Sequence, residues 1–153
     1  MGGGRLMSLR LWMSLGLCLL PATAFADHEL EDRDIENGRA LYATQCAACH
    51  GAELQGQPDW QTPGSDGVLP APPHDRTGHT WHHDNQLLFD YVNLGGAAAL
   101  ERRGVLGFNS GMMGFGDVLS EAEIWDILAY IRSTWPQDVQ EVQASRNPPH
   151  EED

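Results

Sequence analysis

The five residues Cys46-Ala-Ala-Cys49-His50 constrain this chain more than any other feature of its sequence. They place two thiols and an imidazole within five positions. The only other cysteine, Cys18, lies in an apolar N-terminal segment that is treated separately below. The fold and the chemistry of the rest of the chain therefore depend on what Cys46, Cys49 and His50 do.

Three interpretations of the motif lack their usual companions. A redox-active C-x-x-C pair accompanies a βαβ pattern, whereas the regular elements of this chain look all-helical. Structural zinc requires four ligands, and the sequence contains no second cysteine pair. A catalytic thiol requires neither a second cysteine nor a histidine fixed beside it.

The remaining interpretation is covalent haem attachment, for which C-x-x-C-H is the motif. Two thiols three residues apart at the end of a helix face the same side and can reach the two vinyl groups of one porphyrin. His50 would then lie under the ring and place its Nε2 on the iron. The sequence therefore predicts one covalently bound haem c per chain, attached through Cys46 and Cys49.

Residues 1–26 have the layout of a secretory signal peptide. Arg5 and Arg10 precede an apolar run, Leu11 to Leu20, and Ala24 and Ala26 offer small residues before a cleavage site. The run is about half of the roughly 20 residues that a membrane-spanning helix needs, so we expect no stable membrane insertion after cleavage. The expected location is the periplasm.

The charge of the chain limits its partners. The formal net charge is −13, and loss of residues 1–26 removes two arginines and no acidic residue, which makes it −15. The sequence contains no lysine. So acidic a protein lacks the basic surface that nucleic-acid binding needs, and it favours a protein partner with a basic docking patch.

The hydrophobic pattern predicts an all-α fold. A long loop over residues 56–73, rich in glycine and proline, is typical of a segment that wraps a large ligand. The expected domain covers residues 27–136, followed by an acidic, disordered tail over 137–153. The predicted helices cover residues 35–51, 84–94, 97–103 and 120–135.

Three stretches resemble the class I c-type cytochromes: "NGRALYATQCAACHG", "LPAPPH" and "SGMMGFGDVLSEAEIWDILAYIRSTWP". The resemblance implies a cytochrome c fold of three to four helices around one covalently bound haem. It also implies that the first and last helices cross, with Gly38, Tyr42 and Tyr130 at the crossing. The implied function is a periplasmic electron carrier, not an enzyme, that passes single electrons between redox proteins.

The resemblance also assigns the remaining iron-site residues. Met112 would be the second axial ligand opposite His50, with its neighbour Met113 as the rival. The Pro72 carbonyl would accept a hydrogen bond from the other ring nitrogen of His50. His74 stands where the family often has leucine.

Some alternatives remain open on sequence alone. The chain can be an electron-transfer subunit of a larger oxidoreductase, or a haem enzyme or sensor with an open iron site. The histidines beyond the motif are interpreted as part of a polar loop that precedes a helix, with a second metal site or replacement of methionine on the iron as the alternatives. These histidines are His74, His79, His82 and His83.

Overall fold

The computed structural model describes Met1 and residues 28–148, so the predicted signal peptide lies outside the described residues apart from Met1. The described part is helical, and its only β-type pairing is an isolated bridge between Gly95 and Met113. This confirms the predicted all-α class. The elements are η1 (His28–Leu30), α1 (Ile35–Leu41), η2 (Tyr42–Cys46), α2 (Ala47–His50), η3 (Thr80–His82), α3 (Asn85–Leu94), α4 (Gly96–Arg102), α5 (Glu121–Ser133) and α6 (Gln137–Ala144).

The helix expected over residues 35–51 is continuous but contains one wide turn. Asp34 caps its start, accepting a hydrogen bond from the Asn37 backbone N–H at 2.9 Å. The segment η2 is a π-helical turn in which the backbone N–H of Ala47 reaches back to the carbonyl of Tyr42. Single π turns of this kind are frequent at functional sites, and this one leads directly into the C-x-x-C-H motif.

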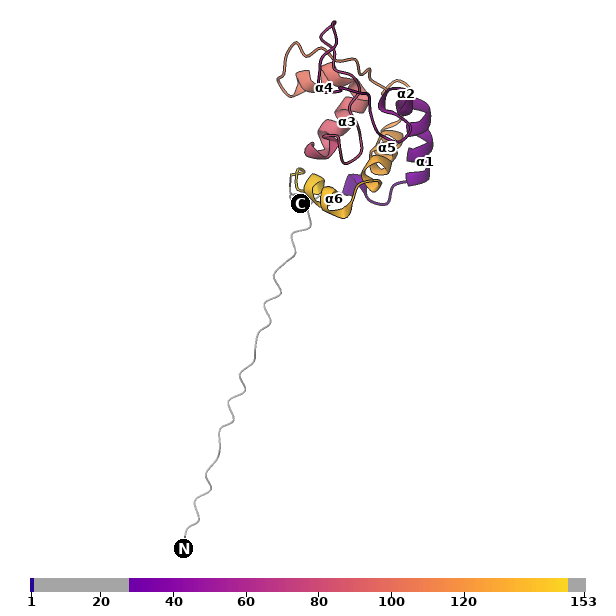
Figure 1. Cartoon of the computed structure of the whole chain (residues 1–153). Helices are drawn as coiled ribbons and strands as arrows, with labels where there is room; N and C mark the ends of the chain where they lie inside the picture. Colours follow the sequence, from indigo (N-terminus) through magenta and orange to yellow (C-terminus); the bar gives the residue numbers. More distant parts are fainter. Residues whose placement is uncertain (2–27, 149–153) are drawn as a thin grey trace.

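Helix α1 packs against α5, and a glycine makes their close approach possible (Figure 1). A Cβ added at Gly38 would lie 2.0 Å from the Asp126 carbonyl oxygen, so only glycine fits at this contact. Beside it the rings of Tyr42 and Tyr130 meet with centroids 5.6 Å apart. The predicted crossing of the first and last family helices is therefore present, although a further helix follows α5.

Helices α3 and α4 form the other half of the molecule. Asp84 caps α3 by accepting from the Leu87 backbone N–H at 2.7 Å. Gly95, with φ of +85°, ends α3 and allows α4 to begin at the next residue. The expected helical turn over residues 97–103 is thus the short helix α4.

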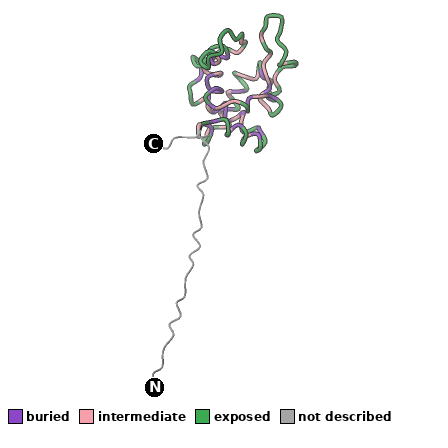
Figure 2. Tube along the Cα trace, turned by 90° about the vertical axis from the view of Figure 1, so that its left-hand side faces the viewer, coloured by how far each residue is buried: buried purple, intermediate pink, exposed green. Residues whose placement is uncertain are grey.

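Helix α5 carries the centre of the core. Its start has the predicted capping box between Ser120 and Glu123. Ile124 and Ile127 are fully buried, and buried residues of α3 and α5 belong to one hydrophobic core cluster. Figure 2 colours the buried positions purple along the Cα trace. Trp135, directly after α5, is also buried.

The predicted disordered tail is wrong for residues 137–148, because they form α6 and a short ordered segment after it. The segment has few apolar side chains, which is why disorder was predicted. Buried polar side chains attach it to the rest of the fold instead. The fully buried Gln143 donates from Nε2 to Asn85 Oδ1 at 2.7 Å, and Asn147 Oδ1 accepts from the Asn85 backbone N–H at 2.7 Å. Residues 149–153 lie outside the described residues.

Among the described residues, none of the helices combines the length and the apolar character required to cross a bilayer.

Candidate functional site

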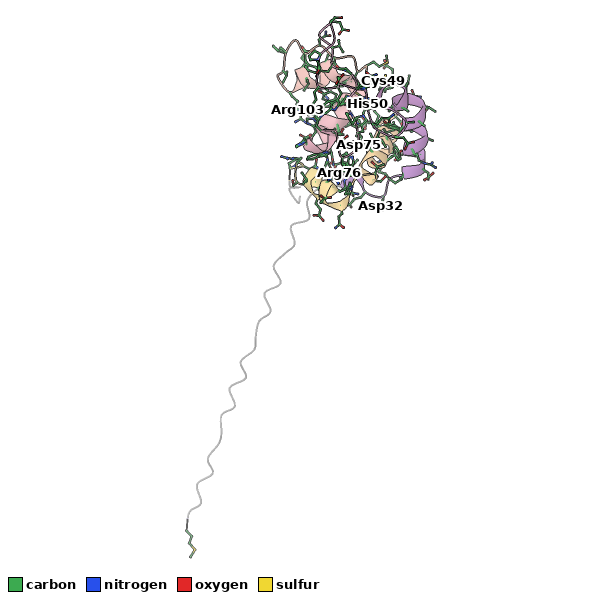
Figure 3. The ribbon with its side chains drawn as sticks, in the orientation of Figure 1. Asp32, Cys49, His50, Asp75, Arg76 and Arg103 are labelled. Carbon is green, nitrogen blue, oxygen red and sulfur yellow. The ribbon has the colours of Figure 1, made fainter. Side chains whose placement is uncertain are left out.

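The C-x-x-C-H motif lies at the C-terminal end of the continuous helical segment formed by α1, η2 and α2. Cys46 is half-buried, Cys49 is exposed, and both thiols are free. His50, the last residue of α2, is only 7% exposed. Figure 3 labels Cys49 and His50 among the side chains. Burial, with a smaller contribution from neighbouring Cys49, raises the pKa of the Cys46 thiol to about 11. The uncharged thiol therefore dominates at neutral pH, which argues against a thiolate nucleophile.

One ring nitrogen of His50 is held by a backbone carbonyl. Its Nδ1 lies 2.9 Å from the Pro72 oxygen, the contact that the resemblance to c-type cytochromes implied. A carbonyl accepts only from N–H, so Nδ1 carries the proton and Nε2 keeps its lone pair. Burial lowers the pKa of His50, and the hydrogen bond that its Nδ1 donates to the Pro72 carbonyl opposes this only in part. The result is a neutral imidazole whose Nε2 can bind a metal.

The loop that carries Pro72 is fixed against the end of α2 by tight backbone contacts. The Gly56 N–H donates to the His50 carbonyl at 2.7 Å, and a Cβ at Gly56 would lie 2.4 Å from the Pro73 nitrogen. The His74 N–H donates to the Leu54 carbonyl at 2.8 Å. These contacts hold the Pro72 carbonyl in place relative to His50.

The loop that carries the two candidate methionines, residues 111–116, lies along the end of α3, and we call it the methionine loop. The Phe115 N–H donates to the Val92 carbonyl at 2.8 Å, and the Gly96 N–H donates to the Met112 carbonyl at 3.1 Å. A Cβ at Gly114 would lie 2.7 Å from the Asn93 carbonyl oxygen, so this close approach requires a glycine at position 114.

The two candidate methionines point in different directions. Met112 is partly buried and packs against the hydrophobic core, whereas Met113 is 70% exposed. The backbone N–H of Met112 donates to Ser110 Oγ at 3.1 Å, which helps to fix the turn at this position.

The additional histidines do not behave as one group. His74 stacks on His50, with ring centroids 4.1 Å apart and an interplanar angle of 25°. His79 stacks on Trp60 at 5.0 Å and meets His83 edge-on, while His82 stacks on Trp81.

The geometry bears on the two alternatives for these histidines, a second metal site and, for His74, replacement of methionine on the iron. Across the described part of the chain, no three His, Cys, Asp or Glu side chains are grouped so that they could hold a metal ion. A ligand opposite His50 has to approach the iron from the other face of a porphyrin. His74, stacked face to face on His50, would lie on the same side of a porphyrin as His50.

Sequence reasoning noted His74 as a departure from the family but missed its contact with His50. The only signal in the sequence was the unusual residue itself. The fold shows that the loop carrying His74 passes over the ring of His50. It also missed Thr80, a buried residue whose Oγ1 lies 2.8 Å from His74 Nδ1.

The donor set fits one covalently attached porphyrin. Two free thiols and a neutral imidazole with one nitrogen already bonded come together at the end of α2, and a thioether sulfur stands on a loop held against α3. An all-α fold with these residues defines a covalent haem protein.

The family comparison agrees with this class. The family described as "Cytochrome c" matches residues 35–135, well over half of the chain. The chain therefore belongs to the cytochrome c family and is a c-type cytochrome with covalently attached haem c, serving haem-based electron transfer with redox partner proteins. Comparisons with curated proteins and with solved structures give no match.

Proposed function

We propose that this chain is a periplasmic monohaem cytochrome that carries single electrons between redox proteins, with His50 and Met112 as axial ligands and no catalytic activity of its own. The observation that carries the proposal is the hydrogen bond between His50 Nδ1 and the Pro72 oxygen. This bond leaves Nε2 as the only nitrogen available to the iron, and bonds of this kind orient metal-binding histidines and raise their basicity.

When bound, haem c supplies an iron that gains or loses one electron. The chain contributes a fixed set of ligands on a rigid frame. Cys46 and Cys49 would form the thioether links, and the packed helices α1, α3 and α5 enclose the site. Because the ligand-bearing segments are held by backbone hydrogen bonds, little has to move when the charge on the iron changes.

The choice of Met112 over Met113 rests on burial and on loop geometry. Met112 packs inward, while the exposed Met113 side chain points away from the core. A methionine ligand raises the reduction potential relative to other ligand sets and closes the iron to external ligands.

The ligand set can be tested by absorption spectroscopy. The oxidised protein should have the weak band near 700 nm that reports an iron–thioether bond. Met112→Ala should lose this band and bind CO rapidly when reduced, whereas Met113→Ala should retain the band. Loss of the band in Met113→Ala alone would overturn the assignment, and rapid CO binding by the wild type would favour the haem enzyme or sensor.

Export and haem attachment can be tested together by mass. The protein recovered from the periplasm should lack residues 1–26 and carry the mass of one haem. Retention of residues 1–26, or a cytoplasmic location of the haem-bearing protein, would contradict the periplasmic part of the proposal.

An uncharged, apolar face beside the methionine loop supports docking of a redox partner. Residues 104–116 contain no charged residue, and neither do residues 67–73. The two segments lie together, because Asn109 Nδ2 donates to the Asp66 carbonyl at 3.0 Å. We call these two segments the uncharged face; their exposed large apolar side chains are Leu69, Val105, Leu106, Phe108 and Met113.

Contact and attraction would therefore come from different parts of the surface. The acidic remainder of the protein attracts a partner with a basic patch over long range, an effect that falls with salt. The uncharged face makes the short-range contact, since apolar surface gains free energy on burial and costs no charge desolvation. Small, transient interfaces are typical of electron-transfer encounters.

Electron self-exchange between oxidised and reduced copies provides a defined probe of this face, measured by NMR line broadening. Leu106→Glu places a charge on the uncharged face and should slow exchange about tenfold or more, because two like charges then meet in the encounter. Val142→Glu on α6 changes the net charge equally at another exposed apolar position and should have a much smaller effect. Equal effects of the two variants would contradict docking at the uncharged face.

A further inference from the structure

The ring of His50 is restrained on two sides by different groups. Along its edge, Nδ1 meets the Pro72 oxygen at 2.9 Å. Across its flat face lies the ring of His74, with centroids 4.1 Å apart and planes inclined by 25°. One hydrogen bond fixes a point on the imidazole but leaves the ring free to turn about the line of that bond. A second ring stacked on the face removes this freedom.

His74 is itself held at three points. Its backbone N–H donates to the Leu54 carbonyl at 2.8 Å, and its carbonyl accepts from Trp135 Nε1 at 2.7 Å. Its Nδ1 lies 2.8 Å from Oγ1 of the buried Thr80. A side chain anchored at both its backbone and its ring can act as a fixed wall for a neighbour.

We propose that His74 is a positioning residue for the haem iron, because its stacked ring sets the orientation of the His50 imidazole plane about the iron–nitrogen axis. The inference rests on the proposed function, in which His50 is an axial ligand. A leucine at this place would have no flat face and no atom that could form a hydrogen bond with Thr80. The orientation of the His50 ring therefore depends on the histidine at position 74.

The orientation of the imidazole plane has a direct electronic consequence. The plane selects which iron d orbital overlaps with the ligand π system, and so determines how unpaired spin spreads over the porphyrin in the oxidised state. The hyperfine shifts of the four haem methyl groups and the electron paramagnetic resonance g-values report this distribution. Second-shell groups of this kind also adjust the reduction potential.

The test uses oxidised, haem-loaded variants. His74→Leu should change the order or spread of the haem methyl shifts and the g-values, and should shift the reduction potential. His74→Phe keeps a flat ring without the bond to Thr80, so it should retain more of the wild-type pattern. Thr80→Val, which leaves His74 in place but unanchored, should change the pattern in the same direction as His74→Leu and by less.

His79→Leu is the matched control, because His79 stacks on Trp60 and makes no ring contact with His50. This variant should leave the shift pattern and the potential as in the wild type. If His74→Leu binds haem with wild-type methyl shifts, g-values and potential, the inference is wrong. If His74→Leu does not fold, wild-type methyl shifts, g-values and potential in Thr80→Val overturn it equally.

Failure of the proposed function would look different. In that case the wild type itself would lack the low-spin spectrum and the band near 700 nm. The His74 inference fails on its own only when that band is present and the variants leave the methyl shifts unchanged.

Discussion

Replacement of Gly38 by alanine tests whether the crossing of α1 and α5 determines the stability of the fold. The added Cβ would lie 2.0 Å from the Asp126 carbonyl oxygen and 2.5 Å from its carbonyl carbon. Ordinary contact begins at 3.4 Å, so the two helix backbones would have to separate locally by the difference, 1.4 Å. Neither atom belongs to a flexible side chain that could rotate away.

The expected free-energy change combines two opposing terms. Alanine in place of glycine favours an isolated helix by about 1 kcal/mol. Overpacking typically costs about 1–3 kcal/mol, and a clash with backbone belongs at or above the upper end. The net loss should be about 2 kcal/mol, which for a domain of this size lowers Tm by about 8 °C.

The assay is guanidinium unfolding of the oxidised haem-loaded protein, followed by helical circular dichroism. Gly104→Ala is the comparison, because a Cβ there meets nothing within 4 Å although φ is +83°. It should cost only the roughly 1 kcal/mol of left-handed backbone strain. If Gly38→Ala is as stable as the wild type, or more stable, the argument from close helix approach is refuted.

Three further predictions concern the frame around the site. Ser120→Ala removes the capping box of α5 and should cost about 1 kcal/mol in urea unfolding, while an unchanged midpoint would mean that the cap contributes nothing. Gln143→Leu removes the buried bond that docks α6 and should lower stability by about 2 kcal/mol; faster amide exchange confined to α6 would locate the effect, and wild-type exchange would count against it. Burial is the main cause that lowers the pKa values of His79 and His83 in the folded protein. In the unfolded chain these histidines have their ordinary pKa of about 6.5, so below that pH the unfolded chain binds protons more readily than the folded protein does. Stability should therefore be retained above that pH and should fall on acidification below it, and His79→Phe should lose less stability than the wild type between pH 7.5 and 5; equal losses would contradict this.

The predictability of the site differs between its parts. The C-x-x-C-H motif, the helix that carries it and the capping box at Ser120 are local patterns, and all three appear as expected. The contact between Pro72 and His50 followed from family resemblance, since no local rule connects two residues 22 positions apart. The stacking of His74 on His50 had no sequence signal beyond an unusual residue.

The largest error concerned α6. Its composition is that of a solvated segment, with few apolar side chains, and local rules therefore predicted disorder. The fold instead buries Gln143 against Asn85, 58 positions away, and satisfies their amide groups through each other. A buried polar pair cannot be distinguished from an exposed one until both partners have been placed.

The sequence by itself determined the covalent chemistry and the succession of helices, because thiol spacing, helix caps and apolar periodicity act over a few residues of chain. Tertiary structure alone decided which methionine packs inward, which ring lies on His50 and whether the C-terminal residues join the core. Those outcomes depend on segments that are distant in sequence and compete for the same space, and packing in three dimensions selects among them.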